Sequence, residues 1–247
     1  MKKLLIIPDV HGIDKWKKSA ADAVISNTHV VFLGDYVDSY IEDGWTIFEN
    51  LKDIIEFKKI YSDKVTLLLG NHDYAYIYRK SAITGYNPYM QHDYRGLFED
   101  NRDLFEVAWG YQGKDKYTLL THAGLTNYFY NNIVKKISDV SHPLYEDLYK
   151  KQRYSKIPIH EMLNYLKDQV SLMWTVGLTR GGMSKSGSIL WADKSELIND
   201  PFKGIDQIVG HTRIPCFDII NNDNDLLYFI DTHDEKTKTI IPLKIEL

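Results

Sequence analysis

The chain has 247 residues, of which 44% are hydrophobic and 26% charged, with a formal net charge of −4. This is ordinary globular composition, and the length suits one large α/β domain. A slightly negative chain has no broad electrostatic attraction to nucleic acid or anionic lipid, so we expect no general nucleic-acid binding. The single cysteine, Cys216, excludes an internal disulfide, and the apolar run at residues 4–7 is too short for a signal peptide or membrane span. We therefore expect a cytoplasmic protein with no membrane association.

Strand and helix patterns alternate through the first third of the chain. The expected strands are residues 3–8, 29–33 and 64–69, and the expected helices are residues 14–26 and 45–60. This βαβαβ order predicts a parallel sheet. Apolar residues recur at helical spacing along the second helix and predict one buried face; they are Trp45, Phe48, Leu51 and Ile55.

The remainder of the chain predicts more strands around a helical insertion. Two strands, 105–111 and 117–121, form an expected hairpin that leads to His122. Residues 126–187 are interpreted as a helical cap, with a helix at 159–173. Further strands are expected at 188–191, 207–210, 226–230 and 239–245, with a turn at 221–225. No linker or repeat divides the chain, which indicates one catalytic domain, residues 1–247, with a cap.

Five short motifs place polar side chains directly after apolar, β-rich runs. Carboxyl ends of parallel strands meet at one edge of a sheet, so these side chains should converge in one cleft. Each motif alone is a weak signal, because turns and helix caps use the same residues, but the ordered set predicts a two-metal hydrolytic centre. The motifs are Pro8-Asp9-Val10-His11-Gly12, Gly34-Asp35-Tyr36-Val37-Asp38, Gly70-Asn71-His72-Asp73, Thr121-His122-Ala123-Gly124 and Gly210-His211-Thr212.

The first two motifs offer ligands for one ion and a bridge to another. Asp9 and His11 are two residues apart, so at an extended strand end their side chains point the same way and can hold one ion together. The carboxylate of Asp35 has lone pairs on both oxygens and can bridge two cations.

The later motifs offer ligands for the second ion. Asn71 supplies an amide oxygen, and His122 and His211 supply imidazole nitrogens. Nitrogen and oxygen ligands without thiolate suit manganese, iron, zinc or nickel, and we expect two divalent ions, with manganese effective in assay. The other histidines match no motif and are expected at the surface or in packing; they are His29, His92, His142, His160 and His233.

The order and spelling of these motifs resemble the calcineurin-like metallophosphoesterase superfamily. Within it, the resemblance is to the branch of serine/threonine phosphoprotein phosphatases, their phage and bacterial relatives and the symmetrical diadenosine tetraphosphatases. It spans the chain from Asp9 to Thr232. It implies a four-layer αββα fold in which two mixed sheets are flanked by helices. It also implies a first ion held by Asp9, His11 and Asp35, and a second held by Asp35, Asn71, His122 and His211.

The resemblance also implies a general acid. The leaving alkoxide of a hydrolysed ester needs a proton, and His72, next to Asn71, is placed to supply it. Asp38 resembles the family residue that orients this histidine.

The departures from the family pattern concern the groups that hold phosphate. Arg213 stands where many distant members have a second metal-binding histidine. Ser39 and Asp193 stand where phosphoprotein phosphatases have phosphate-binding arginines. Arg180, which is followed by two glycines, is the first candidate replacement, and Arg213 is the second.

The motifs and the resemblance together predict hydrolysis of phosphate monoesters, in phosphoproteins or small phosphorylated molecules, by direct attack of a hydroxide that the two ions activate. A dinucleoside polyphosphate hydrolase is an alternative, for which Tyr36, Tyr40 or Trp174 would stack on a base. A phosphodiesterase and a non-catalytic metal-binding interaction module are further alternatives. Neither the natural substrate nor the oligomeric state follows from the sequence.

Overall fold

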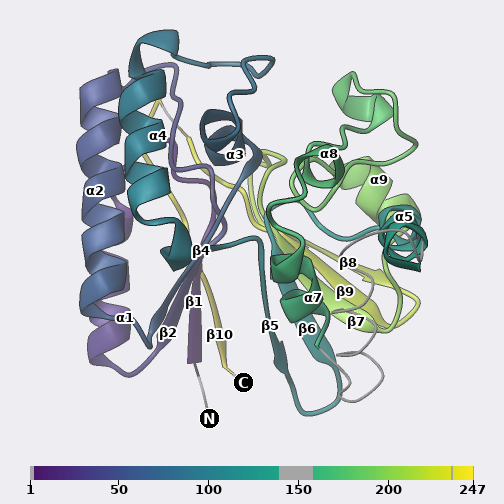
Figure 1. The fold of residues 1–247 in the computed structure, drawn as a ribbon. Helices are drawn as coiled ribbons and strands as arrows, with labels where there is room; N and C mark the ends of the chain where they lie inside the picture. Colours follow the sequence, from purple (N-terminus) through teal and green to yellow (C-terminus); the bar gives the residue numbers. More distant parts are fainter. Residues whose placement is uncertain (1–2, 139–157, 235, 247) are drawn as a thin grey trace.

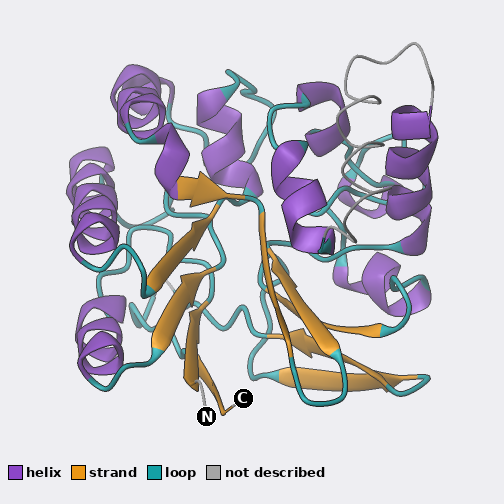
Figure 2. Ribbon diagram, turned by 60° about the horizontal axis from the view of Figure 1, so that its bottom comes forward, coloured by secondary structure: helices purple, strands orange, loops and turns teal. Residues whose placement is uncertain are grey.

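The computed structural model describes residues 3–138, 158–234 and 236–246 (Figure 1). Two five-stranded sheets face each other, and helices lie on their outer sides (Figure 2). This arrangement confirms the predicted α/β fold with two mixed sheets flanked by helices. Among the described residues, no helix is long and apolar enough to cross a membrane.

The first sheet has the strand order β10-β1-β2-β3-β4. Strands β1 to β4 run parallel, and β10 pairs with β1 in the antiparallel direction, so segments from the two ends of the chain lie side by side. The predicted βαβαβ unit is present in full. The strands of this sheet are β1 (Lys3–Ile7), β2 (His29–Phe32), β3 (Val65–Leu68), β4 (Phe105–Glu106) and β10 (Leu243–Glu246).

The strands β1, β2 and β3 are buried on both faces, which explains why they are largely continuous apolar runs. Successive side chains of a strand point to opposite faces. Leu5 and Ile7 therefore pack in the cluster that includes the helices, whereas Leu4 and Ile6 pack with residues of the second sheet.

Helices α1 (Trp16–Ile25), α2 (Gly44–Ile60) and α4 (Gln91–Asp100) cover the outer face of the first sheet (Figure 1). Asp43 caps α2 by accepting hydrogen bonds from the backbone N–H groups of Trp45 and Thr46. The expected burial of Trp45 was wrong, because its side chain is 60% exposed. Leu51 and Ile55 are buried as predicted, and Ile47, Asn50 and Ile54 complete the buried face of α2.

The second sheet has the order β5-β6-β7-β9-β8. Strands β6, β7 and β9 run parallel, whereas β5 and β8 pair antiparallel to their neighbours. Leu120 of β6 and Ile208 of β7 join the apolar cluster between the sheets. The strands are β5 (Ala108–Gln112), β6 (Tyr117–Thr121), β7 (Ile205–Val209), β8 (Asp218–Asn222) and β9 (Asp225–Phe229).

The expected single strand at residues 105–111 is divided between the two sheets, as β4 and β5. At the crossing, the backbone N–H groups of Val107 and Ala108 donate to the side-chain oxygen of Asn164. This contact satisfies two donors where the chain leaves one sheet for the other.

The described part of the expected cap contains helices but also turns at residues 181–187, and residues 139–157 lie outside the described residues. The predicted helix at 159–173 is two short helices. The predicted strand at 188–191 was wrong, because the carbonyl of Ser188 accepts hydrogen bonds from Trp191 and Ala192 and forms a turn. The helices of this half are α5 (Asn127–Ser138), α7 (Ile159–Tyr165), α8 (Val170–Met173), the short 3-10 helix η3 (Leu178–Arg180) and α9 (Lys194–Asn199).

Candidate metal centre

Six parallel strands, three from each sheet, lead into one site. The loops after β1 and β2 carry Asp9, His11, Asp35 and Asp38, and α3 (Asn71–Ile77) begins at the end of β3. From the second sheet, the loops after β6, β7 and β9 carry His122, His211 and His233. All six residues predicted as metal ligands lie together in this site.

The first group of candidate ligands surrounds Nε2 of His122. This atom lies 2.9 Å from Oδ1 of Asn71, 3.1 Å from Nδ1 of His211 and 3.4 Å from Oδ2 of Asp35. Nδ1 of His122 lies 2.9 Å from the carbonyl of Leu33, which can only accept, so Nδ1 carries a proton.

This donor set fits a metal ion. Nε2 of His122 faces two acceptors, the amide oxygen of Asn71 and the carboxylate of Asp35. Burial alone would lower the pKa of His122, but Asp35 and Asp9 raise it to about 10, so without a metal Nε2 holds a proton between these acceptors. A metal ion bound there would take the place of that proton. The ligand atoms of Asp35, His122 and His211 all lie within 4.8 Å of one another, as a shared ion requires.

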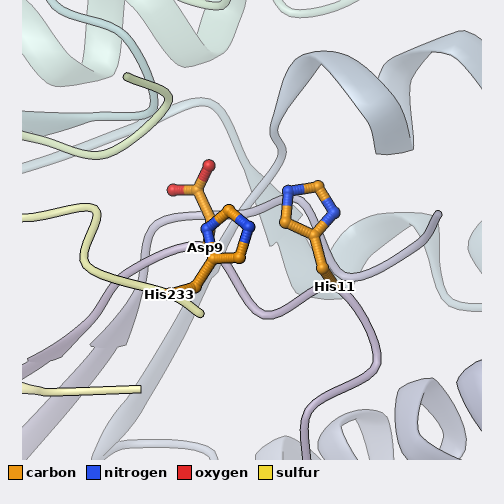
Figure 3. Close-up of side chains that lie close together, drawn as sticks. All are labelled: Asp9, His11 and His233. Carbon is orange, nitrogen blue, oxygen red and sulfur yellow. The ribbon is translucent and has the colours of Figure 1, made fainter. Parts of the chain in front are cut away.

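A second group consists of Asp9, His11 and His233, whose ligand atoms also lie within 4.8 Å of one another (Figure 3). Nδ1 of His11 lies 2.8 Å from the carbonyl oxygen of Asp38, to which it donates, so Nε2 is left as the ligand atom. Nε2 is 3.7 Å from Oδ2 of Asp35. The same carboxylate oxygen thus lies close to both groups, which is the placement of a bridging ligand.

The electrostatics of the two groups favour a bound cation. Burial lowers the pKa of His11 to about 4 and holds that of His211 well below its usual value, so both rings are neutral, as ligands must be. Burial, reinforced by the neighbouring Asp231, raises the pKa of Asp9 to about 7. Metal ions at this site would offset that concentration of buried negative charge.

The ligand loops have unusual backbone conformations. His11, Asp35, Asp38 and His211 all have positive φ, between 44° and 65°, a left-handed region that non-glycine residues rarely adopt. Such positions cost roughly 1–3 kcal/mol each and cluster at functional sites.

Asp73, at the start of α3, stabilises the strained loop after β2. Its carboxylate accepts hydrogen bonds from the backbone N–H groups of Asp35, Tyr36 and Gly70, at 2.7, 2.8 and 2.8 Å. A residue of the motif that follows β3 thereby holds in place the backbone of Asp35, the candidate ligand that follows β2. The final residue of the Gly-Asn-His-Asp motif therefore has a structural role in the site.

Two motif glycines are required by close approach. A Cβ on Gly70 would lie 2.0 Å from Oδ1 of Asp35, and one on Gly210 would lie 2.2 Å from Oδ1 of Asp9. The Gly210 contact joins the two sheets, because Asp9 follows β1 and Gly210 follows β7. The backbone N–H of His211 also donates to Asp9, at 3.0 Å.

We predict that Gly210→Ala displaces the Asp9 carboxylate and weakens metal binding by ~10-fold or more, as outer-sphere disruptions of metal sites do. Isothermal titration of metal-stripped protein with manganese measures this effect. Gly96→Ala is the matched control, since a Cβ on Gly96 of α4 meets nothing within 4 Å. Equal manganese affinity in the two variants would contradict the prediction.

The predicted acid and its orienting carboxylate are paired beside these groups. Nδ1 of His72 lies 2.8 Å from Oδ2 of Asp38, and the hydroxyl of Tyr76 donates to the other oxygen of Asp38 at 2.5 Å. Nε2 of His72 lies 3.9 Å from Oδ2 of Asp35 and thus points toward the metal ligands. Burial alone would lower the pKa of His72, but Asp35 and Asp38 more than offset burial, and the pKa is raised.

The two candidate arginines lie beside different groups of candidate ligands, Arg180 next to the group of His122 and His211, and Arg213 next to the group of His233. Nε of Arg180 is 3.0 Å from Asp193, and its Nη2 donates to Thr212 at 2.7 Å, beside His211. Arg213 instead contacts Nε2 of His233 through its Nη2.

Of the two positions expected for His233, at the surface or in packing, the structure shows a buried one. His233 is 5% exposed and lies against His11, with ring centroids 4.6 Å apart. A signal was present, because Asp231-Thr232-His233 follows an apolar strand and repeats the Asp-x-His spelling of Asp9 and His11.

The other unassigned histidines behave as expected where the structure describes them. His29 stacks on Trp109, His160 lies against Tyr117 and His92 is exposed on α4. His142 lies outside the described residues.

Comparisons with known proteins agree with this architecture. Two solved structures, a cold-active protein-tyrosine phosphatase of a psychrophile Shewanella and a mutant cold-active protein tyrosine phosphatase, are similar in fold, with TM-scores of 0.53 and 0.54. They share 17% and 15% sequence identity with the chain, and each alignment covers 94% of this chain and 71% of the other. No curated protein matches the sequence. The family model of the calcineurin-like phosphoesterases matches residues 2–223. The chain therefore belongs to the calcineurin-like phosphoesterase family, whose members are metal-dependent hydrolases of phosphate esters.

Proposed function

We propose that the protein hydrolyses phosphate monoesters, with His72 as the general acid. The observation that carries this proposal is the His72–Asp38 pair, whose free ring nitrogen lies 3.9 Å from the carboxylate shared by the two ligand groups. A monoester needs a proton on its departing oxygen, and a buried, oriented imidazole beside the reacting centre supplies one.

The proposed ligands are Asp9, His11 and Asp35 for one divalent ion and Asp35, Asn71, His122 and His211 for the other. When bound, such a pair activates water as a nucleophile and neutralises charge on the phosphoryl oxygens. The protein then positions the ester and supplies the proton. Asp38 accepts from Nδ1 of His72, so that Nε2 is the atom that transfers the proton to the leaving oxygen.

Arg180 is the proposed contact for a phosphoryl oxygen. Asp193, which occupies the place of a family arginine, pairs with Arg180 instead, and Thr212 accepts from the same guanidinium. Arg180, at the end of η3, thus places a positive charge beside His211. A guanidinium has five N–H donors, more than these two contacts use, so it can also bind an oxyanion.

We predict that Arg180→Gln lowers kcat/KM for a phosphate monoester by about 10- to 100-fold, since a hydrogen bond to a charged group contributes roughly 1.5–3 kcal/mol. Inhibition by inorganic phosphate should weaken in the same variant. Arg95→Gln is the matched control, because Arg95 pairs with Glu99 on the outer helix α4, on the far side of the first sheet from the second. If Arg180→Gln and Arg95→Gln behave alike, Arg180 does not bind phosphate.

Aryl phosphates, including phosphotyrosine, are the first substrate class to test, because the two solved structures with a similar fold are named as protein-tyrosine phosphatases. Of the residues expected to stack on a base in a dinucleoside polyphosphate hydrolase, Tyr36 is not accessible to a substrate. Tyr36 is fully buried, and its hydroxyl donates to the carbonyl of Leu68. Trp174 is packed near Trp191 and Tyr74.

The test is phosphate release by metal-stripped protein from an aryl phosphate, with and without added manganese. Manganese-dependent release of inorganic phosphate would support the proposal. A diadenosine polyphosphate and an aryl phosphodiester are assayed in parallel under the same conditions. Turnover of either of these without turnover of the monoester would overturn it.

A further inference from the structure

His233 comes from a different strand than the other two members of its group. Asp9 and His11 follow β1 of the first sheet, whereas His233 follows β9 of the second. Its ring lies at 46° to that of His11, and the two imidazoles face each other with the Asp9 carboxylate beside them (Figure 3). A buried polar side chain in this position needs a partner on each ring nitrogen.

The contacts of His233 determine which nitrogen carries the lone pair. Nδ1 lies 2.6 Å from a carboxylate oxygen of Asp231, a fully buried residue, and Nε2 faces the guanidinium of Arg213. A guanidinium can only donate, so Nε2 must accept, and the ring proton is on Nδ1, donated to Asp231. A histidine whose Nδ1–H is held by a carboxylate and whose Nε2 carries the lone pair has the tautomer that metal-ligating histidines use.

We propose that Nε2 of His233 is a ligand of the first ion, together with Asp9, His11 and the shared Asp35. This proposal rests on the proposed metal-dependent function. His233 would reach the first ion from the loop after β9, the strand that pairs with β7, whose own loop carries His211. Asp231 is then a positioning residue, which fixes the tautomer and direction of the ring.

The proposal has a consequence for Arg213. Its guanidinium and a metal ion would use the same lone pair on Nε2, so they are alternative partners of His233. Metal binding at the first site should therefore separate Arg213 from His233. The competing interpretation is that His233 only holds Arg213 in place and leaves the first ion to the other ligands.

The deciding experiment is a crystal structure of the unaltered protein with manganese, using anomalous scattering to locate the ions. We expect two ions, one of them bonded to Nε2 of His233, with Arg213 moved away from the ring. Two ions with His233 still in contact with Arg213 would overturn the proposal and leave the proposed function intact.

Manganese titration provides a readout independent of crystals and of turnover. We expect His233→Gln to weaken one of two sites by ~10²-fold or more, the upper end of what loss of an outer-sphere partner alone costs. His92→Gln, at an exposed position on α4, is the matched control. Two unchanged sites in folded His233→Gln protein would refute the proposal. A manganese-bound His233 in a protein that releases no phosphate would instead refute only the proposed function.

Discussion

Replacing His72 by alanine should lower phosphate release from a monoester by about 10²–10⁴-fold, the usual contribution of a positioned general acid. Both manganese sites should be retained, because His72 is not among the proposed ligands. The loss should be greatest for esters of weakly acidic alcohols and smallest for nitrophenyl phosphate, whose leaving group needs no proton. The measurement is kcat against leaving-group pKa for the two proteins, with His92→Ala as the matched control. A uniform loss across leaving groups would contradict the role of His72 as an acid.

The pH profile gives a second test of the same assignment. Asp38 contributes to the raised pKa of His72, through its hydrogen bond and its charge. Because the acid must be protonated, the rate should fall as pH rises through this raised pKa. In Asp38→Asn the pKa of His72 should drop, and the alkaline limb of kcat should move to lower pH. An unmoved alkaline limb would show that another group controls it.

The Asp35→Asn variant should no longer hold two ions at the same time, because the shared bridging carboxylate is lost. Asparagine tolerates the left-handed conformation of this position, where φ is 50°, and its side-chain oxygen can still accept from the backbone N–H of His72, as Asp35 does at 2.9 Å. The fold should survive, but the bridging charge is lost. Since metal ions contribute several kcal/mol to transition-state stabilisation, we expect activity to fall by more than about 10³-fold.

Metal content after gel filtration, together with kcat, checks the Asp35 prediction. Asp53→Asn is the matched control, because Asp53 is exposed and pairs with Lys17 on the outer helices. Two tightly held ions in Asp35→Asn would show that Asp35 does not bridge them.

Much of the fold followed from the sequence, because apolar periodicity and helix signals are local. The strands β1, β2 and β3 and the helices between them lie within a few residues of the prediction. Residues 105–111 show what local patterns omit. Their β-rich sequence predicts one strand, but the side chain of Asn164, more than 50 residues further on, accepts hydrogen bonds from two backbone N–H groups at the point where the chain changes sheets.

The candidate ligands that belong to short sequence motifs were predictable. A residue that reaches the site only because of the order of strands in the sheet was harder to predict. Asp9 and His11 were found from their spacing. His233 has the same spacing after Asp231 but was assigned to surface or packing, because that spacing alone does not show that β9 lies next to β7. The exposure of Trp45 was missed for a related reason, since the apolar pattern of a helix does not fix the rotation of the helix on its sheet. The assignment of individual ligands and the single-domain interpretation of residues 1–247 stay predictions.

The division of the candidate ligands between the sheets links metal supply to the protein's lifetime. Asp9, His11, Asp35 and Asn71 come from the first sheet, and His122, His211 and His233 from the second, so the ions would act as a cross-link between the two. A ligand that binds only the folded state stabilises it by about 4 kcal/mol at a thousand times its Kd. A cell short of the metal would thus hold a protein that is not only inactive but also opened and degraded more readily. Abundance, as well as activity, would then follow the metal concentration.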